Sequence, residues 1–291
     1  MQRPRLGRVS TATLSGLSPK LSTRCALALL GAMVLASGIG MLALGPVATV
    51  SDAHRLTDPR TPLSLKNGWS VLLQLPLLLA ALAGSLCAFR SAADAPLRHA
   101  WLAFFLLAAA ATLGSMADHL APSGGGHVLS KVPTASACAV LVIIFLAERV
   151  NLTWVSLLPV SLAVASGPIG ALLWLASDML QGRPDDRLLL WLEHLPMLLV
   201  PLGMWSLPSR HLRSSDWIAA LMWFTSAELI AWADLPIWTA SGGGISGHAL
   251  HHLPLAACLF SLALALARQS AEHETASLVS SHRETSLITS G

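Results

Sequence analysis

Three histidines stand together at the start of the last long apolar run of this 291-residue chain. The run reads "SGHALHHLPLAACLFSLALALA" over 246–267, and its histidines are His248, His251 and His252. On a helix, positions i and i+4 lie about 40° apart and one turn above the other, so His248 and His252 can face a single atom. Imidazole is a ligand for zinc, copper, iron and nickel. The pair therefore indicates a metal site, although two histidines at this spacing also occur on ordinary helix surfaces.

A third imidazole is available at the end of an earlier apolar run, which closes on "GSMADHL" over 114–120. If successive runs cross a membrane in alternate directions, His119 lies at the same level as His248 and His252. Three histidines with an open fourth position are the pattern of catalytic zinc, and zinc fits best because no redox partner is visible. Ser115 precedes His119 by four residues and shares its helix face.

The composition is that of a membrane protein with several spans. Hydrophobic residues make up 54% and charged residues 11%, with a mean hydropathy of +0.64. Soluble domains carry about 25% charged residues. The net charge of +3 is too small to indicate a nucleic-acid partner. The four cysteines form no CxxC pair, which argues against a disulfide framework or a thiolate zinc site.

Eight segments are apolar over the roughly 20 residues that a spanning helix needs. They are 26–50, 69–89, 99–119, 132–148, 153–177, 188–207, 216–233 and 248–267. Short connections with Gly and Pro join them and leave no room for a soluble domain. The sequence therefore predicts an all-α polytopic membrane protein. Its C-terminal tail, 269–291, is rich in Ser, Thr and Glu and is expected to be disordered.

The distribution of basic residues predicts the orientation. Residues 1–25 form a basic tail, and 26–50 is either an uncleaved anchor or a signal peptide with "MVLASG" at 33–38 as its cleavage site. The apolar run exceeds the 7–15 residues of a signal core, which favours the anchor. With the N-terminus cytoplasmic, twice as many Lys and Arg residues lie inside as outside, as the positive-inside rule requires. The histidines are then expected near the outer face of a cell membrane, such as a bacterial inner membrane.

Four motifs together resemble those of the alkaline ceramidase-like membrane hydrolases of bacteria. They are "GSMADHLAPSGGGHVLSKVP", "AERV", "DDRLLLWLEHLPMLLVP" and "SGHALHHL", and their order and spacing match over about 52–267, including "TDPRT" at 57–61. The superfamily also holds the progestin/adiponectin-type receptors. The resemblance implies a seven-helix bundle over 52–267, here preceded by one extra helix. It also implies zinc held by His119, His248 and His252, with Ser115 beside the metal.

The sequence departs from that family at the residue that is expected to take up a proton from the metal-bound water. The family has an acidic residue eleven positions after its first histidine, whereas this chain has Ser130, followed by Lys131. Asp118 lies about 100° around the helix from His119 and is expected to face lipid headgroups. Glu193 is expected to be a neutral, hydrogen-bonded acid within the bundle. Asp185 and Arg187 are expected to pair in a loop.

The resemblance implies a zinc-dependent hydrolase of linear amides in ceramide-like lipids, slowed by the absence of an acid at Ser130. Its partners would be the lipid substrate and the bilayer. The alternative is a non-catalytic lipid-binding or receptor-like protein that keeps the zinc. A transporter is less well supported, since the sequence shows no inverted repeat.

Overall fold

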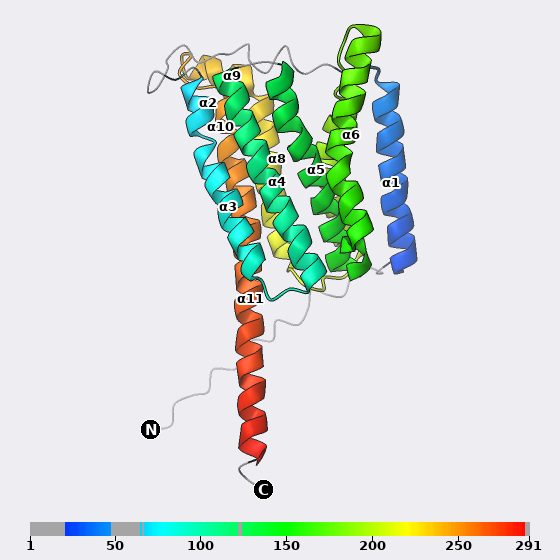
Figure 1. Ribbon diagram of the computed structural model, residues 1–291, viewed down its shortest axis with the longest axis vertical. Coiled ribbons are helices and arrows are strands. Elements are labelled where there is room, and N and C mark those ends of the chain that lie inside the picture. Colours follow the sequence, from blue (N-terminus) through cyan, green and yellow to red (C-terminus); the bar gives the residue numbers. More distant parts are fainter. Residues whose placement is uncertain (1–20, 48–64, 66, 122–123, 289–291) are drawn as a thin grey trace, which may run out of the picture.

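The computed structural model describes residues 21–47, 65, 67–121 and 124–288, and these residues form helices and turns without a strand (Figure 1). Seven helices are long and apolar enough to cross a membrane, and a bent pair of helices supplies an eighth candidate span. The predicted all-α architecture, a seven-helix set with one additional N-terminal helix, is confirmed at this level.

The helices follow one another along the chain with short connections. They are α1 (Thr23–Ala43), α2 (Gly68–Leu72), α3 (Leu75–Arg90), α4 (Ala95–Leu120), α5 (Gly124–Arg149), the 3-10 helix η2 (Leu152–Val155), α6 (Leu157–Gln181), α7 (Arg187–Ser206), α8 (Ser214–Trp232), α9 (Asp234–Ala240), α10 (Gly247–Leu250) and α11 (His252–Ile288). The last span is thus made of α10 and α11, and α2 precedes α3 in the same span.

The first and last helices end elsewhere than the sequence predicted. α1 ends at Ala43 rather than near residue 50, because Gly45 takes a φ of 76° and is followed by a proline. α11 continues to Ile288, where disorder was expected from 269 onward. No Gly or Pro interrupts 269–288, so nothing in this segment breaks the helix. In Figure 1 α11 extends well beyond the other helices at the lower end. The basic tail up to residue 20 and "TDPRT" lie outside the described residues.

α5 begins eight residues earlier than predicted, at Gly124, so most of the expected loop is helix. Pro133 sits inside α5 and cannot donate to the Leu129 carbonyl one turn above. That carbonyl faces α4, where a Cβ placed on Gly114 would lie only 2.5 Å from it. The absence of a side chain at Gly114 therefore lets α4 and α5 pack backbone to backbone, as small residues do between membrane helices.

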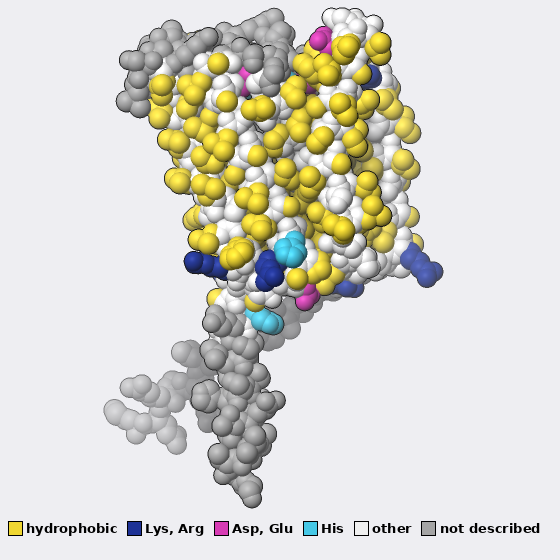
Figure 2. Space-filling view, viewed as in Figure 1, with side chains coloured by type: hydrophobic (Ala, Val, Ile, Leu, Met, Phe, Trp, Pro, Cys, Tyr) yellow, Lys and Arg dark blue, Asp and Glu magenta, His cyan; other side chains and the backbone are white. Residues whose placement is uncertain are grey.

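An aromatic layer fills the core between α4, α5 and α8. Trp101 stacks on Phe105 with ring centroids 5.9 Å apart and lies 6.1 Å from Trp217, which also meets the edge of Phe145. The outward surface is apolar as well: hydrophobic side chains cover most of the visible side of the bundle, and charged ones gather toward its ends (Figure 2). An apolar outside around a packed inside is what a bilayer requires.

α1 packs against α7 at the edge of the bundle. The Trp191 indole nitrogen donates a hydrogen bond to the Ser37 hydroxyl over 3.0 Å, and the Arg187 guanidinium donates to the Leu42 carbonyl over 2.9 Å. These contacts are those of a helix that belongs to the folded bundle. The anchor interpretation of this segment stays a prediction.

Candidate metal centre

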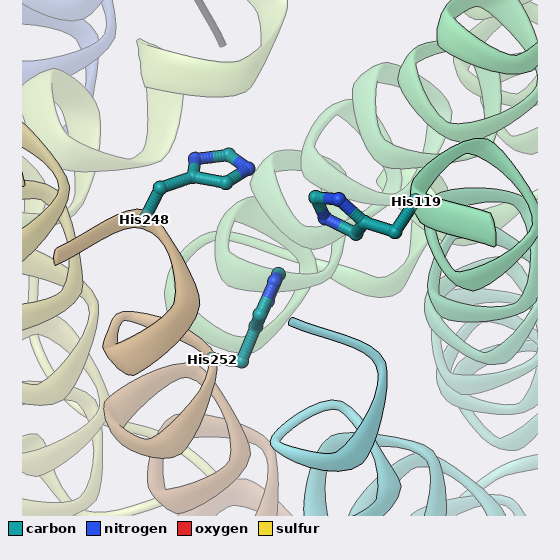
Figure 3. Close-up of side chains that lie close together, drawn as sticks. All are labelled: His119, His248 and His252. Carbon is teal, nitrogen blue, oxygen red and sulfur yellow. The ribbon is translucent and has the colours of Figure 1, made fainter. Parts of the chain in front are cut away.

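The structure brings His119, His248 and His252 together (Figure 3), where α4 ends and the last span begins. Each offers one ring nitrogen, and the three nitrogens lie within 4.8 Å of one another. Tetrahedral zinc with Zn–N bonds of about 2.0–2.1 Å would bring two ligand nitrogens to about 3.3 Å. The most widely separated nitrogens would need to approach by up to about 1.5 Å, so this group could hold a metal ion.

The His248–His252 pair spans a break in the last helix. The Ser246 hydroxyl caps α10 by accepting from the Ala249 amide over 3.0 Å. Pro254 lacks the N–H that would continue the helix ladder onto α10, and His252 begins α11. The two histidines still lie one turn apart, with ring centroids 6.0 Å from each other.

His252 provides the clearest sign that the site fits a metal. Its side chain is 5% exposed, and neither ring nitrogen has a hydrogen-bond partner among the described residues. Buried polar atoms are normally paired, since an unpaired one costs roughly 1–3 kcal/mol. A cation bound by one of these nitrogens would remove that cost, and neutral imidazole is the form that binds metal.

His248 is held in place through its backbone. Its amide donates to Asp234 Oδ1 over 2.7 Å, and Asp234 begins α9 where the chain bends 69° after α8. Next to it, a Cβ on Gly247 would lie 2.4 Å from the Ile230 carbonyl oxygen. α10 therefore sits directly on the α8–α9 bend. Asp234 and Gly247 support His248 through contacts that helical spacing did not predict.

His119 is likewise fixed by its backbone. The Asn67 amide nitrogen donates to the His119 carbonyl over 2.8 Å, and Asn67 is 4% exposed. This carbonyl belongs to the last turn of α4, where no intrahelical donor is available. Asn67 takes a φ of 52°, a left-handed conformation that asparagine tolerates better than most residues. The Asn-Gly pair ahead of the second apolar segment was the available sequence signal.

Replacement of Asp234 by alanine is expected to weaken metal binding by about 10–100-fold, the usual cost of losing a group that orients a ligand. The His248 amide would lose its acceptor, and α10 would lose one of its attachments to the bend. Asp234→Asn keeps an oxygen acceptor and should lose much less. Competition with a chromophoric chelator measures both affinities. Equal affinities for wild type and Asp234→Ala would show that this contact does not position the ligand.

Neither serine of the predicted site belongs to the ligand group. Ser115 lies on α4 one turn from His119 and is partly buried. Ser130 lies within α5, and its hydroxyl donates to the His127 carbonyl of its own helix over 3.1 Å. The stretch between the predicted spans 99–119 and 132–148 is therefore not all loop, because its glycines start α5 at Gly124.

Asp118 was expected to face lipid headgroups. It is instead buried and only 6% exposed. Its Oδ1 would lie 2.2 Å from a Cβ on Gly126, so the carboxylate packs against the first turn of α5. A helix N-terminus carries partial positive charge and favours a carboxylate there. The early start of α5 thus explains the burial of Asp118.

The ring of His251 lies beside the rings of His248 and His252. Its ring centroid is 4.1 Å from that of His252 and 4.9 Å from that of His248. Its nitrogens are nevertheless outside the group that could share one ion, and its Nδ1 is buried without a partner among the described residues.

The carboxylates of α7 and the preceding loop are ion-paired. Glu193, which was expected to be hydrogen-bonded within the bundle, accepts a hydrogen bond from the Lys131 ammonium over 2.8 Å. Asp185 and Arg187 pair at 2.7 Å, as predicted. Partial burial opposes ionisation of Asp185, but the hydrogen bonds from Arg187 outweigh it and lower the pKa of Asp185.

Comparisons of the chain with protein-family models, with curated proteins and with solved structures each gave no match. The function must therefore be inferred from the histidine group, the contacts that support it and the motifs of the sequence.

Proposed function

We propose that this protein is a zinc-dependent intramembrane hydrolase of amide bonds in ceramide-like lipids. The observation that carries the proposal is the group of buried His119 and His252 and half-buried His248, in which His252 has no other partner for its nitrogens among the described residues. Zinc at such a site lowers the pKa of its bound water to about 7 and polarises a carbonyl oxygen. The likeness of the surrounding motifs to the alkaline ceramidase-like hydrolases supports the choice of substrate.

The position of the group suits a lipid amide. His119 lies in the last turn of α4, and His248 and His252 lie at the start of the last span. The visible side of the bundle is mostly apolar (Figure 2). A ceramide-like lipid holds its amide near the headgroups and its acyl chains in the hydrocarbon core. Ser115, one turn below His119 on α4, could then hydrogen-bond the carbonyl oxygen or orient the attacking water.

Purified protein is expected to release fatty acid from a fluorescent ceramide slowly, to stop when a chelator removes zinc, and to resume when zinc is restored. Ceramide turnover should follow zinc content as it is titrated back. Zinc-loaded protein that cleaves no lipid amide would rule out the hydrolase.

The second candidate is a non-catalytic lipid-binding or receptor-like protein that retains the metal. Ser130 favours it, since a serine bonded to its own helix cannot take up a proton from water at neutral pH. In that case the protein should bind ceramide and zinc in a one-to-one ratio without turnover. Equilibrium binding of a fluorescent ceramide, measured beside fatty-acid release, separates the two candidates.

We also propose a bacterial inner-membrane location with a cytoplasmic N-terminus. In a Cys25→Ser and Cys87→Ser background, an impermeant thiol reagent is expected to label Ala240→Cys in intact cells, and Ser209→Cys only after lysis. Both positions are exposed and lie at opposite ends of α8 and α9. The reverse pattern would invert the orientation and place the histidines at the cytoplasmic side.

A further inference from the structure

The span formed by α8 and α9 is bent by 69° between the two helices. Pro236 has no N–H to offer the Trp232 carbonyl one turn earlier, so the helical hydrogen-bond ladder is interrupted there. The ladder resumes in α9, where the Ile237 amide donates to the Ala233 carbonyl over 3.0 Å. With α8 crossing the bilayer, α9 is turned most of the way toward the membrane plane, at the upper end of the bundle in Figure 1.

An exposed apolar surface on α8 continues past this bend. Its side chains recur at intervals of three, four or seven residues, as one face of a helix requires. They are Ile218, Met222, Leu229, Trp232 and Leu235, each at least 46% exposed. On a bundle in a bilayer such a face contacts lipid. Trp232, 91% exposed, and Leu235, 61% exposed, thus carry the lipid-facing surface from α8 onto α9.

The other side of the same turn of α9 supports a candidate ligand. Asp234, next to Leu235, accepts a hydrogen bond from the His248 amide over 2.7 Å. Gly247 packs against the backbone of Asp234, since a Cβ placed on this glycine would lie 2.8 Å from the Asp234 Cα. The first turn of α9 therefore joins the exposed apolar surface to the backbone of His248.

The connection between α9 and α10 is bonded back onto α9. The Gly243 amide donates to the Trp238 carbonyl over 2.9 Å. The Gly244 and Ile245 amides both donate to the Ser241 hydroxyl over 3.2 Å. A turn closed in this way has little freedom to absorb a displacement. A movement of α9 is therefore passed on to α10 and to the ligand that α10 carries.

A lipid surface is the partner that fits the exposed side of α9. This side is continuous with the face of α8 that a bilayer must cover, and Trp232 stands where α8 ends. Tryptophan is enriched at that level of a span, where hydrocarbon meets the headgroups. A helix that presents apolar side chains outward at this level lies in the interfacial region of the membrane.

We propose that α9 is a membrane-surface helix, seated in the headgroup region of the bilayer by Trp232 and Leu235, and that this seating holds His248 in position to bind the metal. The inference rests on the candidate metal centre, whatever reaction that centre performs. The bilayer is then a partner of the site: lipid contact fixes α9, and α9 fixes α10 through Asp234.

The first test measures where α9 lies in the membrane. A nitroxide label at Leu235→Cys is compared with labels at Leu229→Cys and Ser209→Cys for its collisions with oxygen and with a water-soluble nickel chelate. All three positions are exposed. The value at Leu235 should fall between that at Leu229, in hydrocarbon, and that at Ser209, in water. A value equal to either reference would overturn the seating of α9. Dipolar broadening of the Leu235 spectrum would show instead that a second copy of the chain covers this face.

The second test measures zinc affinity in nanodiscs by competition with a chromophoric chelator. Replacing Trp232 and Leu235 together by serine should weaken binding by about tenfold, the lower end of the range for loss of an orienting group, because both act on the ligand only through α9. Leu235→Ser alone should give a smaller loss in the same direction, and it keeps the test usable if the paired variant fails to fold.

Leu180→Ser is the matched control for the serine substitutions. Leu180 is 84% exposed in the last turn of α6, so its replacement removes a comparable apolar side chain without touching α8, α9 or α10. Its zinc affinity should equal that of wild type. Wild-type affinity in the paired variant, or an equal loss in this control, would overturn the role of α9.

Asp234→Ala separates transmission through Asp234 from a general loosening of the bundle. If lipid contact acts through Asp234, adding the two serine substitutions to Asp234→Ala should weaken zinc binding no further. Losses that multiply in the combined variant would overturn this path. A wild-type protein that binds no zinc would remove the candidate centre and the coupling together, whereas the spin labels would still decide whether α9 lies at the membrane surface.

Discussion

His252→Ala is expected to remove the metal from the protein. Wild type should bind about one zinc per chain, and the variant should retain almost none after dialysis. Loss of an outer-shell partner already costs about 10–100-fold in affinity, and loss of a direct ligand should cost more. His252 is also the buried side chain whose two nitrogens have no other partner in the described part of the chain. Elemental analysis of purified protein measures the zinc content directly.

His251→Ala is the matched control for this experiment. The two residues are adjacent, and their rings are 4.1 Å apart, but the nitrogens of His251 lie outside the group that could share one ion. The control should therefore retain its zinc, while His119→Ala should lose it as His252→Ala does. Full zinc content in both His119→Ala and His252→Ala would show that the metal is bound elsewhere.

Gly247→Ala should have the second-largest effect, although it changes no ligand. The added methyl would lie 2.4 Å from the Ile230 carbonyl oxygen and 2.8 Å from the Asp234 Cα, and both are backbone atoms that cannot rotate away. α10 would have to move off the α8–α9 bend, taking His248 with it. We expect zinc affinity to fall by at least about 100-fold, the upper range for loss of an orienting contact.

Gly40→Ala separates this displacement from a general effect of replacing glycine in a membrane helix. Gly40 lies in α1, and a Cβ there would meet nothing within 4 Å. Alanine should be neutral or slightly stabilising at that position, because it has the higher helix propensity. A Gly247→Ala protein with wild-type zinc affinity would mean that α10 can shift without moving His248.

The sequence predicted the spans and the grouping of the histidines because both follow from periodicity and alternation. The length of an apolar run predicts a membrane span, and successive spans cross in alternate directions. Two residues four apart on a helix lie on the same face. Together these rules were enough to place His119 beside His248 and His252 at one end of the bundle.

The supports of the site could not be predicted, because they are backbone contacts between segments far apart in the chain. Asn67 bonds to the carbonyl of His119, and Asp234 bonds to the amide of His248. Such contacts depend on where helices end and bend, which spacing along one helix does not reveal. The same reason explains why the start of α5 was missed: a run of glycines reads as a loop, yet here close packing against Asp118 calls for a residue without a side chain.

The ligands of the centre come from helices that are far apart in sequence. His119 ends α4, whereas His248 and His252 lie in the last span, roughly 130 residues later. A bound ion would therefore act as a cross-link that closes a long loop containing α5 to α9. Since an ion that binds only the folded chain stabilises it by mass action, melting temperature should depend on free zinc concentration. The supply of metal would then affect how much of the protein stays folded.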